Sequence, residues 1–113
     1  MSLPLHELEL DVRDGALVAT VVGEIDLTNV AAIEGRILEV ARRERVRVVV
    51  LDMSRVEYLD SAAFAAIQRI AAVVPVKLAV ARTATVYRAV IVAGLDRMAP
   101  TFETVAAALR SNG

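Results

Sequence analysis

The chain contains no cysteine and a single histidine among its 113 residues. The absence of cysteine excludes thiol catalysis and a cysteine-based zinc site, and it gives no sign of an oxidising compartment. We therefore expect a cytoplasmic protein. The five glycines are scattered, and none forms the GxGxxG or GxxxxGK[ST] pattern of a phosphate-binding loop. We expect the chain to bind no nucleotide or other cofactor itself.

An excess of either charge is also missing, since 13 basic residues face 14 acidic ones and the net charge is -1. This balance argues against nucleic-acid binding, which depends on neutralising phosphates. A long hydrophobic run is missing too: the most apolar late stretch, residues 70–81, is short and includes Pro75 and Lys77. The first residues are acidic where a signal peptide would be basic. We expect neither a membrane segment nor a secretion signal.

Serine catalysis normally needs a neighbouring base, and this chain offers little that could act as one. Its one histidine, His6, lies near the start of the chain, on an expected edge strand where we expect it to be solvated. We therefore predict that the protein is not an enzyme, with no catalytic residue and no metal site.

Strand-like and helix-like patterns alternate along the chain and predict one α/β domain over residues 1–113. Apolar residues alternate with charged ones over residues 8–13, and Asp14-Gly15 then favours a tight turn into a second strand over 16–22. Further strands are expected at 46–53, near 76–81 and near Met98. Helices are expected from a cap at Asp26 or Thr28, from Ser61, over about 84–93, and from 101 to about 109. The fold class is a mixed sheet with an N-terminal antiparallel hairpin, parallel crossovers and about four helices.

Residues 46–70 are the most informative segment. A run of β-branched residues ends near Asp52, a short polar turn follows, and apolar residues then recur at helical spacing from Phe64. The helix is expected to open at Asp60 or Ser61. A phosphate on the serine would suit a helix start, although both residue types are also common caps with no further role.

The segment DMSRVEYLDSAAF, residues 52–64, resembles the signature of the STAS family, whose founding members are anti-sigma factor antagonists. The motifs GEID at 23–26 and GLDRM at 94–98 fall where similar motifs occur in that family, so the resemblance covers nearly the whole chain. The family usually has Ser or Thr and then Gly after the Asp-Ser pair. This chain has Ala62 and Ala63 there.

The resemblance implies a protein-interaction switch controlled at Ser61. The unphosphorylated domain would bind an anti-sigma factor that is also a serine kinase, with ATP or ADP bound by that partner, and phosphorylation of Ser61 would end the binding. A weak homodimer is compatible with this interpretation. The alternative is a STAS scaffold or accessory subunit of a transport or signalling complex without a phosphorylation cycle, and Ala62 and Ala63 keep this alternative open.

Helical spacing turns one alanine-rich face of the helix from Ser61 away from the core side. That face carries Ala62, Ala65, Ala66, Arg69 and Val73, and we expect it to contact the partner unless other helices cover it. Glu24 and Asp26 fall where the family lines the phosphorylation site, although Asp26 is equally suited to a helix cap. The predicted partner-binding residues are Asp26, Asp60, Ser61, Ala62, Ala65 and Arg69. Arg82 is expected to be solvated.

Overall fold

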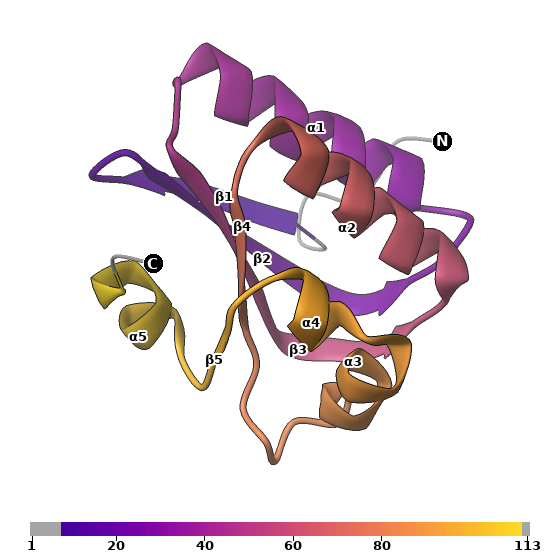
Figure 1. Cartoon of the computed structure of the whole chain (residues 1–113). Helices are drawn as coiled ribbons and strands as arrows, with labels where there is room; N and C mark the ends of the chain where they lie inside the picture. Colours follow the sequence, from indigo (N-terminus) through magenta and orange to yellow (C-terminus); the bar gives the residue numbers. More distant parts are fainter. Residues whose placement is uncertain (1–7, 112–113) are drawn as a thin grey trace.

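The computed structural model describes residues 8–111, which form a five-stranded sheet with helices on both faces (Figure 1). The strands are β1 (Leu8–Arg13), β2 (Ala16–Ile25), β3 (Val48–Leu59), β4 (Val76–Ala79) and β5 (Thr101–Phe102). The helices are α1 (Val30–Arg43), α2 (Ser61–Val73), α3 (Tyr87–Ala93), α4 (Leu95–Met98) and α5 (Val105–Arg110). The predicted α/β class is confirmed. His6 lies outside the described residues.

The strands lie side by side in the order in which they occur in the chain. β1 pairs with β2 antiparallel, and every later pair is parallel, so the predicted N-terminal hairpin is present. Asp14 and Gly15 form its turn with positive φ angles of 48° and 83°, a conformation that favours this dipeptide. Within residues 8–111, no helix is long and apolar enough to cross a membrane.

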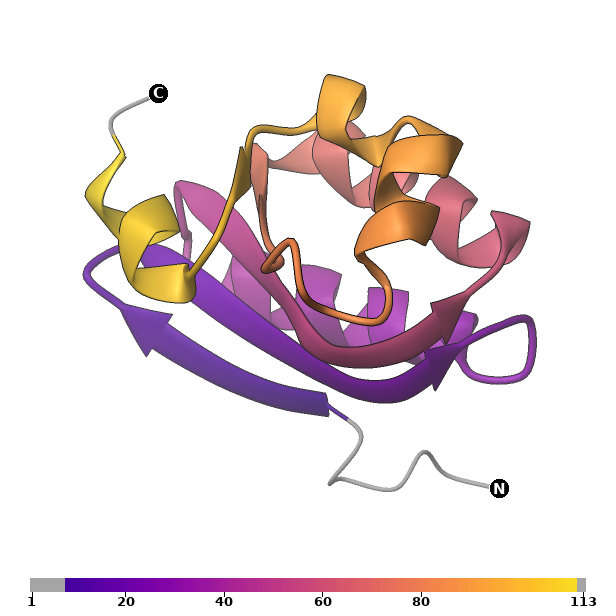
Figure 2. The same cartoon turned by 90° about the horizontal axis from the view of Figure 1, so that it is seen from below.

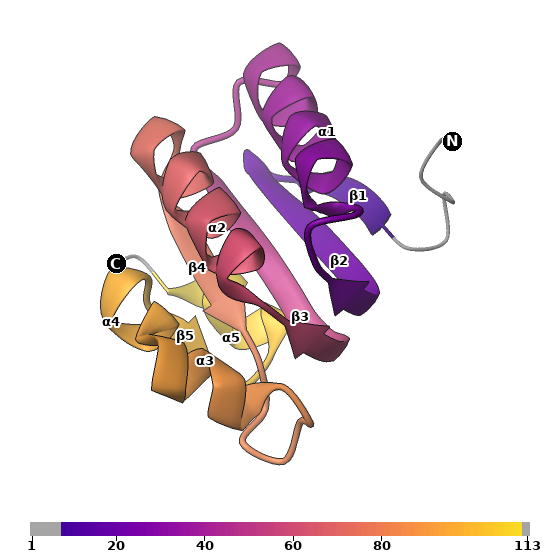
Figure 3. The same cartoon turned by 90° about the vertical axis from the view of Figure 1, so that its right-hand side faces the viewer.

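The two faces of the sheet are covered unequally. Helices α1 to α4 bury the larger hydrophobic cluster on one face, and Figure 3 shows α1 and α2 side by side over the sheet. On the other face α5 covers a smaller cluster of Val18, Val50, Ala79 and Ala108. The sheet is therefore covered on both faces at its centre.

β3 is longer than the sequence pattern predicts, because it continues past Met53 to Leu59. Its register against β2 shifts twice: Thr20 pairs with Asp52 but Val22 pairs with Arg55, and the second shift follows Gly23. Such bulges bend a strand while the ladder continues, and Figure 2 shows β2 and β3 curving together. The polar stretch that we expected to be a turn is thus a bulged strand.

Two predicted helix starts and one predicted strand position are also wrong. Neither Asp26 nor Thr28 caps α1, because the helix starts at Val30 and Asn29 is the residue before it. The region near Met98 is helix α4, which a left-handed Gly94 separates from α3, and the expected short strand lies at Thr101–Phe102. The last helix consequently begins at Val105, where the Thr104 side chain accepts a bond from the N–H of Ala107.

Candidate functional site

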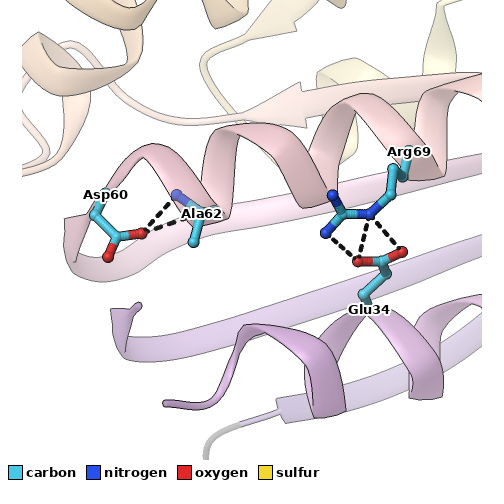
Figure 4. A network of polar contacts seen from close by, with 5 residues as sticks. Glu34, Asp60, Ala62 and Arg69 are labelled. Carbon is cyan, nitrogen blue, oxygen red and sulfur yellow. Dashed lines mark hydrogen bonds and ion pairs between the residues drawn. The ribbon is translucent and has the colours of Figure 1, made fainter. Parts of the chain in front are cut away.

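The start of α2 is held by the side chain of Asp60, the last residue before the helix. Its Oδ1 accepts hydrogen bonds from the backbone N–H groups of Ala62 at 2.9 Å and Ala63 at 3.2 Å (Figure 4). These bonds satisfy donors that a helix start otherwise leaves unpaired. Asp60 is therefore the cap, and Ser61 is the first helical residue without a capping task of its own.

The hydroxyl of Ser61 is the feature that distinguishes this serine from its neighbours. Ser61 is exposed, and its hydroxyl forms no hydrogen bond with any residue that the structure describes. By contrast, the Ser54 hydroxyl donates to Asp52 Oδ1 at 2.7 Å. The Thr28 hydroxyl donates in the same way to Oδ1 of Asp26. Ser61 alone of these three presents a hydroxyl that no neighbouring carboxylate holds.

Ser61 lies at a shallow, mostly apolar hollow between α2 and α3. The hollow has a volume of about 370 Å³, and its lining residues are Leu59, Asp60, Ser61, Phe64, Ala89, Val92 and Ala93. Three of them belong to α3 and were not foreseen, because nothing local in the sequence shows that α3 packs beside the start of α2. Val92 is 78% exposed. An apolar residue at an exposed helix position was the signal in the sequence that could have indicated a contact surface on α3.

The loop between β2 and α1 lies next to this hollow. The backbone N–H of Asp60 donates at 3.3 Å to the carbonyl of Ile25, the last residue of β2 before this loop. Asp26 folds back on its own loop, where its carboxylate accepts bonds from the hydroxyl and the backbone N–H of Thr28. These two bonds, the hydroxyl first, hold the pKa of Asp26 below its ordinary value. Leu27 at the tip is 79% exposed.

The outward face of α2 is narrower than its helical spacing indicates. Ala66 is only 4% exposed, so its assignment to the outer face is wrong. The cause is that α2 packs against α1 as well as the sheet, which buries a wider arc of the helix. Ala62 and Ala65 are half-buried, and Val73 is 51% exposed.

Arg69 is tied to α1 by a bidentate ion pair with Glu34. Its Nη2 lies 2.7 Å from Oε1 of Glu34, and its Nε lies 3.0 Å from both carboxylate oxygens (Figure 4). The hydrogen bonds to Glu34 raise the pKa of Arg69 above its ordinary value. Arg69 therefore bridges the two helices, and a partner must share it with Glu34 or displace it.

The remaining acidic and basic candidates do not gather around Ser61. Asp52 accepts bonds from Ser54 and, at 3.4 Å, from the hydroxyl of Thr20, both on the strands. Arg82 is exposed beside Glu103, with 3.8 Å between the charged groups. Among residues 8–111, no group of three or more histidine, aspartate or glutamate side chains is placed to hold a metal ion.

Comparison with known proteins identifies the fold. Residues 7–108 match the sequence profile of the STAS domain. The chain belongs to the STAS family. This family has a non-enzymatic regulatory fold, so the prediction that the protein is not an enzyme is confirmed. No curated protein sequence matches the chain.

Solved structures place this STAS domain near the anti-sigma factor antagonists. One from Mycobacterium paratuberculosis is 27% identical, with a TM-score of 0.78 over 90% of this chain and 89% of that one. Phosphorylated SpoIIAA from Bacillus is 18% identical, with a TM-score of 0.58 over 90% and 96%. A sulfate transporter family protein from Wolinella succinogenes is 19% identical, with a TM-score of 0.70 over 88% and 85%. The last two likenesses concern the fold alone.

Proposed function

We propose that this STAS domain is an anti-sigma factor antagonist. It binds an anti-sigma factor that is also a serine kinase, and phosphorylation of Ser61 by that kinase ends the binding. The nucleotide is bound by the kinase. The likeness to the mycobacterial antagonist supports the class of partner.

The observation that carries the proposal is the unheld hydroxyl of Ser61 beside an apolar hollow. A kinase needs an acceptor hydroxyl that it can reach, and Ser61 is exposed at the first residue of a 13-residue helix. Negative charge is favoured at such a helix end, and the first turn of α2 contains no acidic residue. The phosphorylated domain can therefore remain folded.

The same surroundings explain how a phosphate would end binding. No cation lines the hollow, and its one charged residue is Asp60. A phosphate of about −1.5 to −2 charges placed there meets no basic group among the described residues that line the hollow. A partner that packs closely on the hollow would have to desolvate that charge, which is costly unless the partner supplies a cation.

The alanine that replaces the usual family glycine does not oppose this function. Ala63 is fully buried, and its side chain packs in the core between α2 and α1. Its methyl group is thus directed into the core and away from an approaching active site. Ala62 is half-buried, and its small side chain leaves room for a partner next to Ser61.

The test is a phosphorylation assay with the candidate anti-sigma kinases of the same organism. The wild type, Ser61→Ala and the matched control Ser54→Ala are each incubated with kinase and ATP, and the peptides are analysed by mass spectrometry. We expect one phosphate on Ser61 in the wild type and in Ser54→Ala, and none in Ser61→Ala. Phosphate on another residue, or none with any kinase, would instead favour the scaffold without a phosphorylation cycle.

A further inference from the structure

A second hollow lies at the far end of β3 from Ser61, where the parallel strands begin. It has a volume of about 570 Å³ and opens between the β1–β2 hairpin and the end of α5. Ligand sites commonly have volumes of about 300–1,000 Å³. Three cations line it from separate elements, Arg13 of β1, Arg47 before β3 and Lys77 of β4, together with a single acid, Asp14.

Lys77 is the buried group of this hollow. It is 7% exposed and is the only charged residue buried among residues 8–111. Its Nζ donates to the carbonyl oxygens of Ala108 at 3.1 Å and Ser111 at 2.7 Å, and it lies 5.7 Å from the ring centre of Phe102. These dipoles hold the ammonium group in place, but no carboxylate of the described residues pairs with it. An ammonium group has three donors, and two are used here.

Arg47 also has no carboxylate partner in the part of the chain that the structure describes. Its guanidinium packs against Gly15, and its Nη2 donates to the carbonyl of Asp14 at 3.0 Å. Arg13 differs, because Asp11 lies 2.6 Å from its Nε. Two positive charges, those of Arg47 and Lys77, are therefore held at the hollow without a paired carboxylate among residues 8–111.

The surroundings add positive charge and supply an apolar floor. Arg42 and Arg43 end α1, and Arg45 follows in a left-handed conformation with a φ of 52° at this same end of the sheet. Arg43 is paired with Glu44 at 3.2 Å, so the added charge comes from Arg42 and Arg45. This concentration is local, because the whole chain has a net charge of -1. The other lining residues include Ala16, Val48, Pro75 and Leu109, which are apolar.

We infer that this hollow binds a small organic anion, a phosphate monoester with an apolar body. A phosphate dianion matches two unpaired cations from different elements, and the guanidinium of Arg47 can bind two of its oxygens. A carboxylate carries one negative charge and would neutralise only one of the two cations. The apolar floor takes the body of the ligand. The site is independent of Ser61, which lies beyond the other end of β3.

The test is an NMR titration of the full chain with phenyl phosphate, alongside benzoate and inorganic phosphate. We expect phenyl phosphate to shift the backbone amides of Gly15, Lys77 and Ala108, and to bind more tightly than either comparison compound. Tighter binding of benzoate would overturn the phosphate assignment. Absence of shifts at these amides, or shifts centred on α2, would overturn the site.

Arg47→Gln is the variant that tests the cation, and Arg42→Gln is its matched control. Both arginines are exposed at the same end of the domain, but only Arg47 lines the hollow. Loss of the charge-assisted bonds should weaken phenyl phosphate binding about tenfold in Arg47→Gln and leave Arg42→Gln near the wild type. Equal weakening in both variants would mean that only the general field attracts the anion, and would overturn the proposal. Melting curves of both variants check that they fold.

Discussion

At the carboxyl end of β3, carboxylates accept hydrogen bonds from backbone N–H groups. At its amino end, two cations have no carboxylate partner among the described residues. Asp60 caps α2 and Asp26 closes its own loop, so the surface around Ser61 is a mostly apolar hollow. At the amino end, Arg47 and Lys77 bond to carbonyl oxygens, which cannot neutralise them. One end is therefore suited to close contact with a protein and the other to an anion.

The difference also explains why a change of charge should have different effects at the two ends. A phosphate on Ser61 enters a hollow whose described lining residues include no cation, so it should disturb contact with a partner more than it disturbs the fold. Removal of a cation at the amino end changes the support of α5 itself, because Lys77 bonds to its last turn. The predictions below test whether the two ends separate in this way, beginning with the largest effect.

The largest effect is expected at the Ser61 end, in partner binding. Ser61→Asp should weaken affinity for the anti-sigma kinase by about 2–5 kcal/mol, which is more than tenfold, because the carboxylate must be desolvated without a matching cation. Ser61→Ala should bind nearly as the wild type, and titration calorimetry measures both variants. Equal affinities would remove Ser61 from the interface.

The second effect is expected in stability, at the amino end. Lys77→Met keeps most of the side-chain volume but removes the donor to the Ala108 carbonyl, so the free energy of unfolding should fall by about 1–2 kcal/mol. Urea unfolding measures the loss. Lys77→Gln keeps a donor and should lose less. A Lys77→Met variant as stable as the wild type would show that burying the ammonium group costs as much as its bonds return.

The third effect is expected in stability at the carboxyl end of β3, where variants of Asp60 and Ser61 show which residue caps α2. Asp60→Ala removes the acceptor for two backbone N–H groups and should lower the free energy of unfolding by about 1 kcal/mol. Asp60→Asn retains an acceptor and should lose only part of this. Ser61→Ala should leave stability nearly unchanged, and urea unfolding of the three variants decides. A larger loss in Ser61→Ala than in Asp60→Ala would mean that Ser61 is the true cap.

The sequence predicted those features of the fold that depend on local chemistry. The alternation in β1, the Asp14-Gly15 turn and the helix start at Ser61 each follow from residues close together in the chain. The continued pairing of β3 did not, because two bulges absorb a polar stretch that looks like a turn. Whether a bulge forms there depends on the pairing with β2, and the local sequence of β3 carries no information about that pairing.

The site was predicted in part for the same reason. Ser61 and Asp60 were found because cap chemistry is local, but the α3 side of the hollow depends on tertiary packing alone. Ala66 was misplaced because a helical wheel assumes one buried side, and α2 has two. Lys77 gave no signal, since a lysine within an apolar strand pattern does not show which carbonyl groups it will meet.

The smallest effect is expected in the acid titration of the loop beside Ser61. Thr28→Val removes the hydroxyl that contributes most to holding down the pKa of Asp26, so this pKa should rise towards its ordinary value in the variant. NMR titration of the Asp26 carboxyl measures the rise. The backbone bond from Thr28 remains, so the rise should be partial.

The sign of the linked stability change follows from the direction of this shift. A carboxyl whose pKa is lower in the folded state stabilises the fold above the pKa of the unfolded chain, and that contribution disappears as the pH falls through the folded pKa. Wild type and Thr28→Val should therefore differ most near neutral pH and converge in acid. In an Asp26→Asn background the same substitution should lose its pH dependence. A pH-dependent effect that persists there would assign the titration to another group and leave Asp26 without its role in ordering the loop.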